Sequence, residues 1–115
     1  MSICYEKLIS AFGLALRAGK CSVGTERCVV DIRAHYAKLV IVPEDISDNT
    51  KKRIYSAVSF HGVPIIELPC SKSTLGERLG KTGGISCAAV TDEGFVKIVE
   101  KIYGEIHTGH TEVQQ

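Results

Sequence analysis

The sequence lacks the features that mark several large classes of protein. Its 115 residues contain no run of eighteen apolar residues, so no membrane-spanning helix is expected. The first residues, SICYEKLIS, have the pattern of neither a secretory signal nor a transit peptide, and internal repeats and low-complexity segments are absent. A hydrophobic content of 44% at this length suffices for one core. We therefore expect one soluble, cytoplasmic domain without membrane contact.

Cysteine occurs, but not in a pattern that indicates disulfides or a metal site. The five cysteines are odd in number and include no C-x-x-C pair, which argues against a disulfide framework. His107 and His110 have no cysteine or carboxylate at ligand spacing. We expect most of the thiols to be small buried apolar groups, and we expect no metal and no cofactor.

Motifs for catalysis are also scarce. There is no G-x-S-x-G and no metal-binding helix pattern. Residues 76–82, GERLGKT, resemble a phosphate-binding loop but have three residues between the glycines where that motif has four. They also follow a predicted helix, whereas the motif follows a buried strand. We predict that the protein is not an enzyme, and a small nucleotide-binding enzyme using this loop is kept as an alternative.

The charge of the chain is small but unevenly distributed. The formal net charge is +1, which is modest for a protein that neutralises phosphates. Residues 1–53 carry nine Lys and Arg against six Asp and Glu, whereas residues 54–115 carry five against seven. The N-terminal half can therefore form a basic face, although charged runs are more often plain solvated surface.

Hydrophobic periodicity predicts helices that alternate with short, buried strands. A capping box from Thr74 to Glu77 should begin a short helix, and Asp92 should cap the last one. This alternation predicts a single α/β domain over residues 1–106, with helices on both faces of a sheet of about four strands. Residues 107–115 lack apolar periodicity, and we expect a mobile tail there. Helices are predicted over residues 4–18, 25–35, 74–79 and 92–106, with a further helix that follows the turn and cap residue types at 45–49 and ends at about His61. Strands are predicted over residues 20–23, 38–42, 65–68 and 85–90. Tyr36 should lie on the apolar stripe of the second helix, and residues 80–84 should be flexible.

One stretch, residues 19–33 (GKCSVGTERCVVDIR), has the character of an anion-binding site. A glycine break leads through a short strand to a second glycine, Gly24, and a helix then begins at Thr25. The first N–H groups of such a helix have no partner within the helix and favour anionic ligands. Basic side chains near this helix and in the loop over residues 70–75 could extend the surface.

Five motifs, in order along residues 8–99, resemble the kink-turn-binding ribosomal protein family, the L-seven-Ae and L-thirty-e class. The resemblance implies a three-layer α-β-α sandwich with a mixed sheet, which binds sharply bent RNA through the glycine turn and the loop before the short helix. It also implies structured RNA, with ribosomal RNA and the ribosome as candidate partners. The motifs are A-G-K-x-x-x-G-T (residues 18–25), A-K-L-V-I-V-x-E-D (37–45), G-V-P (62–64), S-K-x-x-L-G (71–76) and A-A-V-T-D-E-G (88–94).

The resulting hypothesis is a non-enzymatic, monomeric protein that recognises kinked RNA by its shape and by phosphate contacts. Archaeal members have Asn-Glu after the G-T, where this chain has Glu26 and Arg27, and a lysine where this chain has Val30. A glutamate offers only acceptors to a base edge, so target preference should differ. A protein–protein interaction module on the same fold is the other alternative. The RNA-binding positions are Lys20, Gly24, Thr25, Glu26, Arg27, Arg33, Lys72, Ser73 and Leu75.

Overall fold

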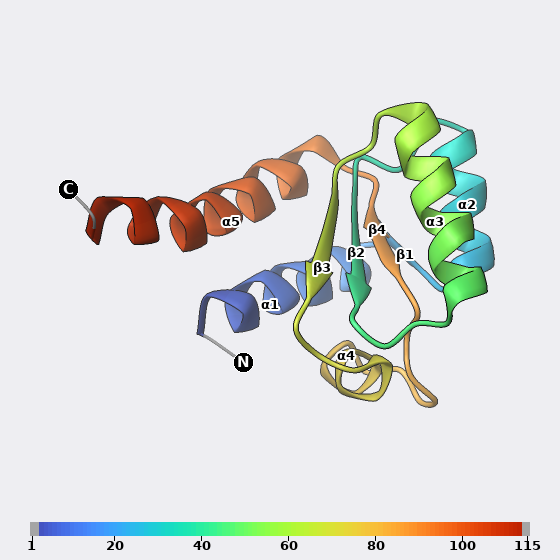
Figure 1. Cartoon of the computed structure of the whole chain (residues 1–115), viewed down its shortest axis with the longest axis horizontal. Helices are drawn as coiled ribbons and strands as arrows, with labels where there is room; N and C mark the ends of the chain where they lie inside the picture. Colours follow the sequence, from blue (N-terminus) through green and yellow to red (C-terminus); the bar gives the residue numbers. More distant parts are fainter. Residues whose placement is uncertain (1–2, 114–115) are drawn as a thin grey trace.

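The computed structural model describes the backbone of residues 3–113 and the side chains of residues 5–104. Its four strands form one mixed sheet in the order β1-β4-β2-β3, in which β2 and β3 are parallel and the other neighbours are antiparallel (Figure 1). The elements are α1 (Ile3–Arg17), β1 (Cys21–Val23), α2 (Thr25–Arg33), β2 (Leu39–Pro43), α3 (Asp48–His61), β3 (Ile65–Leu68), α4 (Lys72–Arg78), β4 (Ala88–Val90) and α5 (Glu93–Val113).

Helices cover both faces of this sheet. Side chains of α1, α4 and α5 pack against one face, and those of α2 and α3 pack against the other (Figure 1). Strand β2 is buried along its whole length because its side chains alternate between the two cores: Leu39 faces the first, and Val40 faces the second. The prediction of a three-layer α-β-α sandwich with a mixed four-stranded sheet is confirmed.

Helix ends follow the local sequence closely where a cap or a glycine defines them. The Ser47 hydroxyl accepts from the Thr50 N–H at 3.2 Å and begins α3, and Gly62 ends it in the left-handed region at φ 68°. Gly19, at φ 73°, ends α1. The Phe95 N–H donates to the Asp92 carboxylate at 3.3 Å, which confirms the predicted cap of α5.

Three predicted boundaries are wrong. Helix α2 ends at Arg33, because the N–H groups of Tyr36 and Ala37 both donate to the Asp31 carbonyl, and Tyr36 is consequently 64% exposed rather than on the apolar stripe. Strand β4 has only three residues, because the Ile85 N–H donates to the Lys72 carbonyl instead of to a neighbouring strand. Helix α4 begins at Lys72 with Ser71 as its cap, not at the capping box over residues 74–77.

The last helix is longer than expected. Helix α5 runs through Val113, so the stretch predicted as a tail is helical as far as that residue, and residues 114–115 lie outside the described part. The mobility predicted for residues 107–115 stays a prediction. No helix within the described residues has the length and apolar character needed to cross a membrane.

Candidate functional site

The glycine turn before α2 leaves the start of this helix without a side-chain cap. Gly24 adopts φ 94° and ψ 152°, a backbone conformation that residues with a side chain rarely adopt. Its N–H donates to the Cys87 carbonyl at 2.9 Å. Whereas Ser47 and Ser71 cap α3 and α4, no side chain accepts from the first turn of α2. The first N–H groups of α2, with the positive end of the helix dipole, therefore remain available to an anion.

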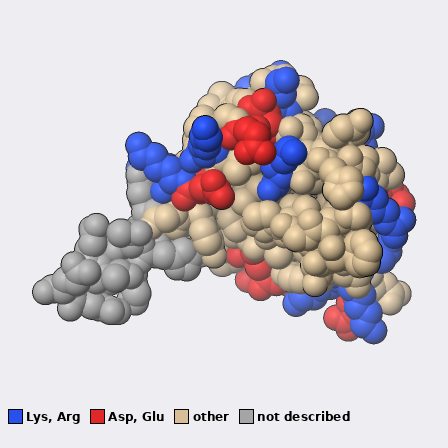
Figure 2. Space-filling model, turned by 90° about the horizontal axis from the view of Figure 1, so that it is seen from above, with Lys and Arg blue, Asp and Glu red and all other residues tan. Residues whose placement is uncertain are grey.

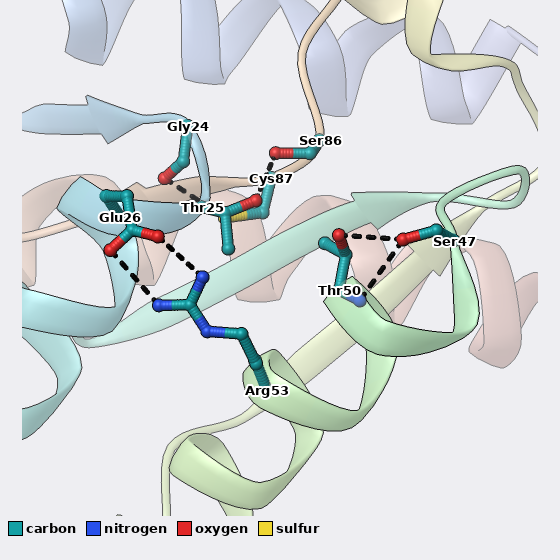
Figure 3. Close-up of polar contacts among 8 residues, drawn as sticks. All are labelled: Gly24, Thr25, Glu26, Ser47, Thr50, Arg53, Ser86 and Cys87. Atoms are coloured by element: carbon teal, nitrogen blue, oxygen red, sulfur yellow. Dashed lines mark hydrogen bonds and ion pairs between the residues drawn. The ribbon is translucent and has the colours of Figure 1, made fainter.

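A distant loop lies directly beside this helix start. The Thr25 and Ser86 hydroxyls form a hydrogen bond of 2.6 Å, which joins α2 to the loop over residues 80–86 (Figure 3). The same loop is fixed to α4, since the Ile85 N–H donates to the Lys72 carbonyl at 3.1 Å. The start of α2 and the start of α4 are thus held together through this loop.

Two glycines allow the loop to approach α4 this closely. A Cβ on Gly76 would lie 2.7 Å from the Gly84 Cα, a distance that backbone and side-chain carbons do not reach without displacement. Gly84 also has φ 89°. The sequence predicts only flexibility for residues 80–84, whereas the structure shows that this segment holds the two helix starts together. Gly76 within a predicted helix was the available signal, because a glycine inside a regular element often marks a close backbone approach.

The segment that resembles a phosphate-binding loop has a different geometry. Its N–H groups at Leu79, Gly80 and Lys81 donate to carbonyls of α4, at 3.0, 3.2 and 2.7 Å respectively. They close the C-terminal end of a helix and cannot converge on a phosphate. The nucleotide-binding hypothesis loses its structural basis here.

Glu26, the second residue of α2, is held by a residue of α3. Arg53 donates to both carboxylate oxygens of Glu26, from Nη1 at 2.5 Å and from Nη2 at 3.1 Å (Figure 3). These hydrogen bonds and the charge of the guanidinium hold the pKa of Glu26 below its ordinary value and raise the pKa of Arg53. The pair fixes the direction of the carboxylate at the edge of the uncapped helix start. Arg53 was not predicted, because the contact depends on how α2 packs against α3.

Arg27 turns in the opposite direction, back along its own helix. Its Nε lies 3.4 Å from the Asp31 carboxylate, which also accepts from the Ser22 hydroxyl of β1. Asp31 is a buried carboxylate, and these two donors satisfy it. Most of the Arg27 side chain remains exposed, so its guanidinium can still reach a ligand beside β1. The i, i+4 spacing of Arg27 and Asp31 could have indicated this pair from the sequence.

A family model, the Ribosomal protein L7Ae/L30e/S12e/Gadd45 family, matches residues 6–100. The chain belongs to this family. The resemblance found in its motifs is therefore confirmed.

Similar proteins include two bacterial relatives and one solved structure. RNA-binding protein YlxQ of Enterococcus faecium is 36% identical over 97 residues, covering 84% of this chain and 91% of the relative. RNA-binding protein YlxQ of Bacillus subtilis is 39% identical over 83 residues, covering 72% and 81%. The 15.5kD RNA binding protein of Giardia lamblia has a TM-score of 0.75 at 18% identity, covering 94% of this chain and 91% of that chain, and it shares the fold.

The structure gathers part of the predicted site of this family member at one end of the sheet. Helix α4 and the starts of α2 and α3 lie together at the lower end in Figure 1. We call this surface the Gly24 end and define it by Gly24, Thr25, Glu26, Lys72, Ser73 and the loop over residues 80–86. Lys72 and Ser73 line a hollow of about 510 Å³ there, which Lys81 and Asp45 also line.

Other predicted residues lie elsewhere. The Leu75 side chain is fully buried in the core, so it does not face a ligand, and a role of this position in RNA binding stays a prediction. Lys20 precedes β1 at the opposite end of that strand from Gly24, where its carbonyl accepts from the Thr91 N–H. Arg33 is the last residue of α2, seven positions beyond Glu26 and so about 10 Å away along the helix. These two cations do not belong to the Gly24 end.

The two helices that begin at the Gly24 end, α2 and α3, carry a small excess of basic side chains. Helices α2 and α3 together carry five Lys and Arg against three Asp and Glu. Figure 2, which is seen from above and so from the side opposite the Gly24 end, shows Lys and Arg at intervals along the right-hand edge, the side on which Figure 1 places α2 and α3, with acidic groups among them. No cluster of three or more potential metal ligands occurs in the described part of the chain.

Proposed function

We propose that this protein is a non-enzymatic, cytoplasmic RNA-binding protein of the ribosomal type, and that it binds kinked RNA at the Gly24 end. The observation that carries the proposal is the uncapped start of α2, held beside α4 by the loop over residues 80–86. Free helix N–H groups suit a phosphate, and a rigid concave arrangement of two helix starts suits a bent backbone. The names of the YlxQ relatives, both RNA-binding proteins, support the same function.

In this proposal, recognition is mainly of shape. The backbone N–H groups of α2 and the side chain of Lys72 contact phosphates of an RNA that is already sharply bent, as in a kink-turn. The exposed guanidinium of Arg27 contacts a further phosphate of the same RNA, on the β1 side of α2. Glu26 offers acceptors only, so it binds an amino group on an exposed base edge, and Arg53 holds the carboxylate in one orientation. Binding and positioning of the RNA require no chemical step.

The site is tested by gel-shift titration of a kink-turn RNA with the double variant Arg27→Ala, Lys72→Ala. We expect about a tenfold loss of affinity, and a decrease of roughly one in the salt slope for each phosphate contact removed. Lys97→Ala, an exposed lysine on α5, is the matched control and should bind as the wild type does.

The test distinguishes a wrong assignment of the site from a failure of the RNA-binding proposal itself. Equal affinity of the wild type and the double variant would contradict the assignment of the site but leave RNA binding intact. Failure of the wild type to bind any kinked RNA, together with purification in complex with a protein, would favour the protein–protein alternative instead.

A further inference from the structure

A second surface, continuous with the Gly24 end, runs between the outer sides of α2 and α3. It is a groove of about 760 Å³. It begins beside Arg53, which Glu26 holds, and it ends at Phe60 and His61 in the last turn of α3. From Arg53 to Phe60 the helix rises about 10 Å, which equals the length of about three stacked nucleotides. The residues that line this α2–α3 groove are Arg33, Lys52, Arg53, Ser56, Ala57, Phe60 and His61.

The charge of the groove has one sign. Its lining includes three cations and no carboxylate. Arg53 is paired with Glu26, but none of the ion pairs among residues 5–104 uses Arg33 or Lys52. Two cations outside these ion pairs, on neighbouring helices that face one groove, are suited to a polyanion.

An aromatic group closes the far end of the groove. Phe60 is 85% exposed, the highest exposure among the large apolar side chains described. Its ring lies edge-to-face with that of His61, at 5.0 Å between centroids, and His61 lies in the same way against His35 at 5.1 Å. The Phe60 ring is thus held in place by a neighbouring ring while most of its surface faces solvent. Exposed aromatics beside unpaired cations are the combination that binds single-stranded nucleic acid.

We propose that the α2–α3 groove binds a short single-stranded extension of the RNA that the Gly24 end holds. One base stacks on Phe60, and the adjoining phosphates contact Arg33 and Lys52. The inference rests on the proposed RNA-binding function and adds a second contact to it. A protein partner fits this groove less well, because Phe60 is the one large apolar side chain in its lining, whereas the three cations complement a phosphate backbone.

The test compares a blunt kink-turn RNA with the same RNA carrying four unpaired uridines at its 5′ or its 3′ end, by fluorescence anisotropy. The wild type should bind one of the extended RNAs about tenfold more tightly than the blunt RNA, as expected for one stacked base with phosphate contacts. Phe60→Ala should abolish this advantage without changing the affinity for the blunt RNA. Tyr36→Ala, which removes an exposed aromatic outside the groove, is the matched control and should keep the advantage.

A crosslink provides an independent measurement. With 4-thiouridine in the extension, irradiation should attach the RNA to the peptide that contains Phe60 and His61. If the wild type binds blunt and extended RNA equally and no crosslink maps to this peptide, the groove proposal is overturned while the proposed function stands. If the wild type binds none of the RNAs, both are overturned.

Discussion

Thr25 and Ser86, 61 residues apart in the sequence, share a hydrogen bond of 2.6 Å between their hydroxyl groups. This contact joins the first residue of α2 to the loop over residues 80–86. Because the same loop is bonded to α4, the contact sets the distance between the starts of α2 and α4 at the Gly24 end. A double-mutant cycle with Thr25→Val and Ser86→Ala should give a coupling of about 0.5–1.5 kcal/mol in the free energy of unfolding. The measurement is urea denaturation of the four proteins.

The matched control is a second cycle in which Thr25→Val is combined with Ser73→Ala instead of Ser86→Ala, because Ser73 lies exposed on α4. Thr25→Val and Ser73→Ala should be additive within about 0.5 kcal/mol. Additive effects of Thr25→Val and Ser86→Ala would mean that the two hydroxyls do not interact.

The close approach of Gly76 and Gly84 gives a second prediction. Gly76→Ala places a methyl group 2.7 Å from the Gly84 Cα, so the backbone of the loop must move. We expect a loss of about 1–3 kcal/mol in the free energy of unfolding. Gly13→Ala in α1 is the control, because the added Cβ would meet its nearest atoms at 3.8 Å, an ordinary contact. That substitution should be neutral or stabilise the protein by up to about 1 kcal/mol. Equal stability of both variants would contradict the described packing.

The Glu26–Arg53 pair predicts how the carboxylate titrates. Because Arg53 lowers the pKa of Glu26, an NMR titration of the side-chain carboxyl should find its midpoint below the usual value of about 4.3, and Arg53→Gln should return it towards that value. Lys51→Gln removes a charge two positions before Arg53 in the same helix, where it pairs with Glu67, and should leave the midpoint of Glu26 unchanged. An ordinary midpoint in the wild type would show that the pair does not form in solution.

The same shift determines how the pair affects stability with pH. A carboxyl whose pKa is lower in the folded state contributes stability above its unfolded-state pKa, and the contribution is lost as the pH falls through the folded-state value. Both side chains are exposed, so this contribution is small. The value of the pair lies in orienting Glu26.

Three of the five cysteines, Cys21, Cys28 and Cys70, should be unreactive in the folded protein. Burial raises the pKa of the Cys21 thiol to about 12. The pKa of Cys28 is raised by a hydrogen bond with Cys87 and by burial. Burial also raises the pKa of Cys70. The reactive thiolate is therefore scarce at pH 8. Alkylation followed by peptide mass spectrometry should label these three residues slowly in native protein and rapidly in urea. Equal rates in both conditions would contradict their burial.

Local patterns predicted most of the fold, and long-range contacts explain most of what they missed. The end of α3 was predicted at about His61, before the turn at Gly62, whereas its start could not be chosen among the turn and cap residue types at 45–49, of which Ser47 is the cap. The start of α4 was misplaced because Ser71 and Thr74 are both capping residue types three positions apart, and only the structure shows which one caps. The approach of Ser86 to Thr25 depends on strand order, which sequence periodicity does not encode.

The candidate site was also predicted only in part, because some of its contacts join residues that are far apart in the sequence. The glycine turn and the start of α2 have a clear local pattern at Gly24, and the structure places an uncapped helix start there. The sequence could not show that Glu26 would meet Arg53, because that requires two helices to pack side by side. It also could not separate Leu75, whose side chain faces the core, from its exposed neighbours in the same short helix.

The central claim is that the Gly24 end selects kinked RNA. The most direct measurement is the dissociation constant, by fluorescence anisotropy at fixed salt, for a kink-turn RNA and for the same RNA with its tandem sheared G·A pairs replaced by Watson–Crick pairs. The account predicts at least about tenfold tighter binding to the kinked RNA, because only a bent backbone can contact the starts of α2 and α4 together. Equal affinity for the kinked and the straight RNA would contradict it.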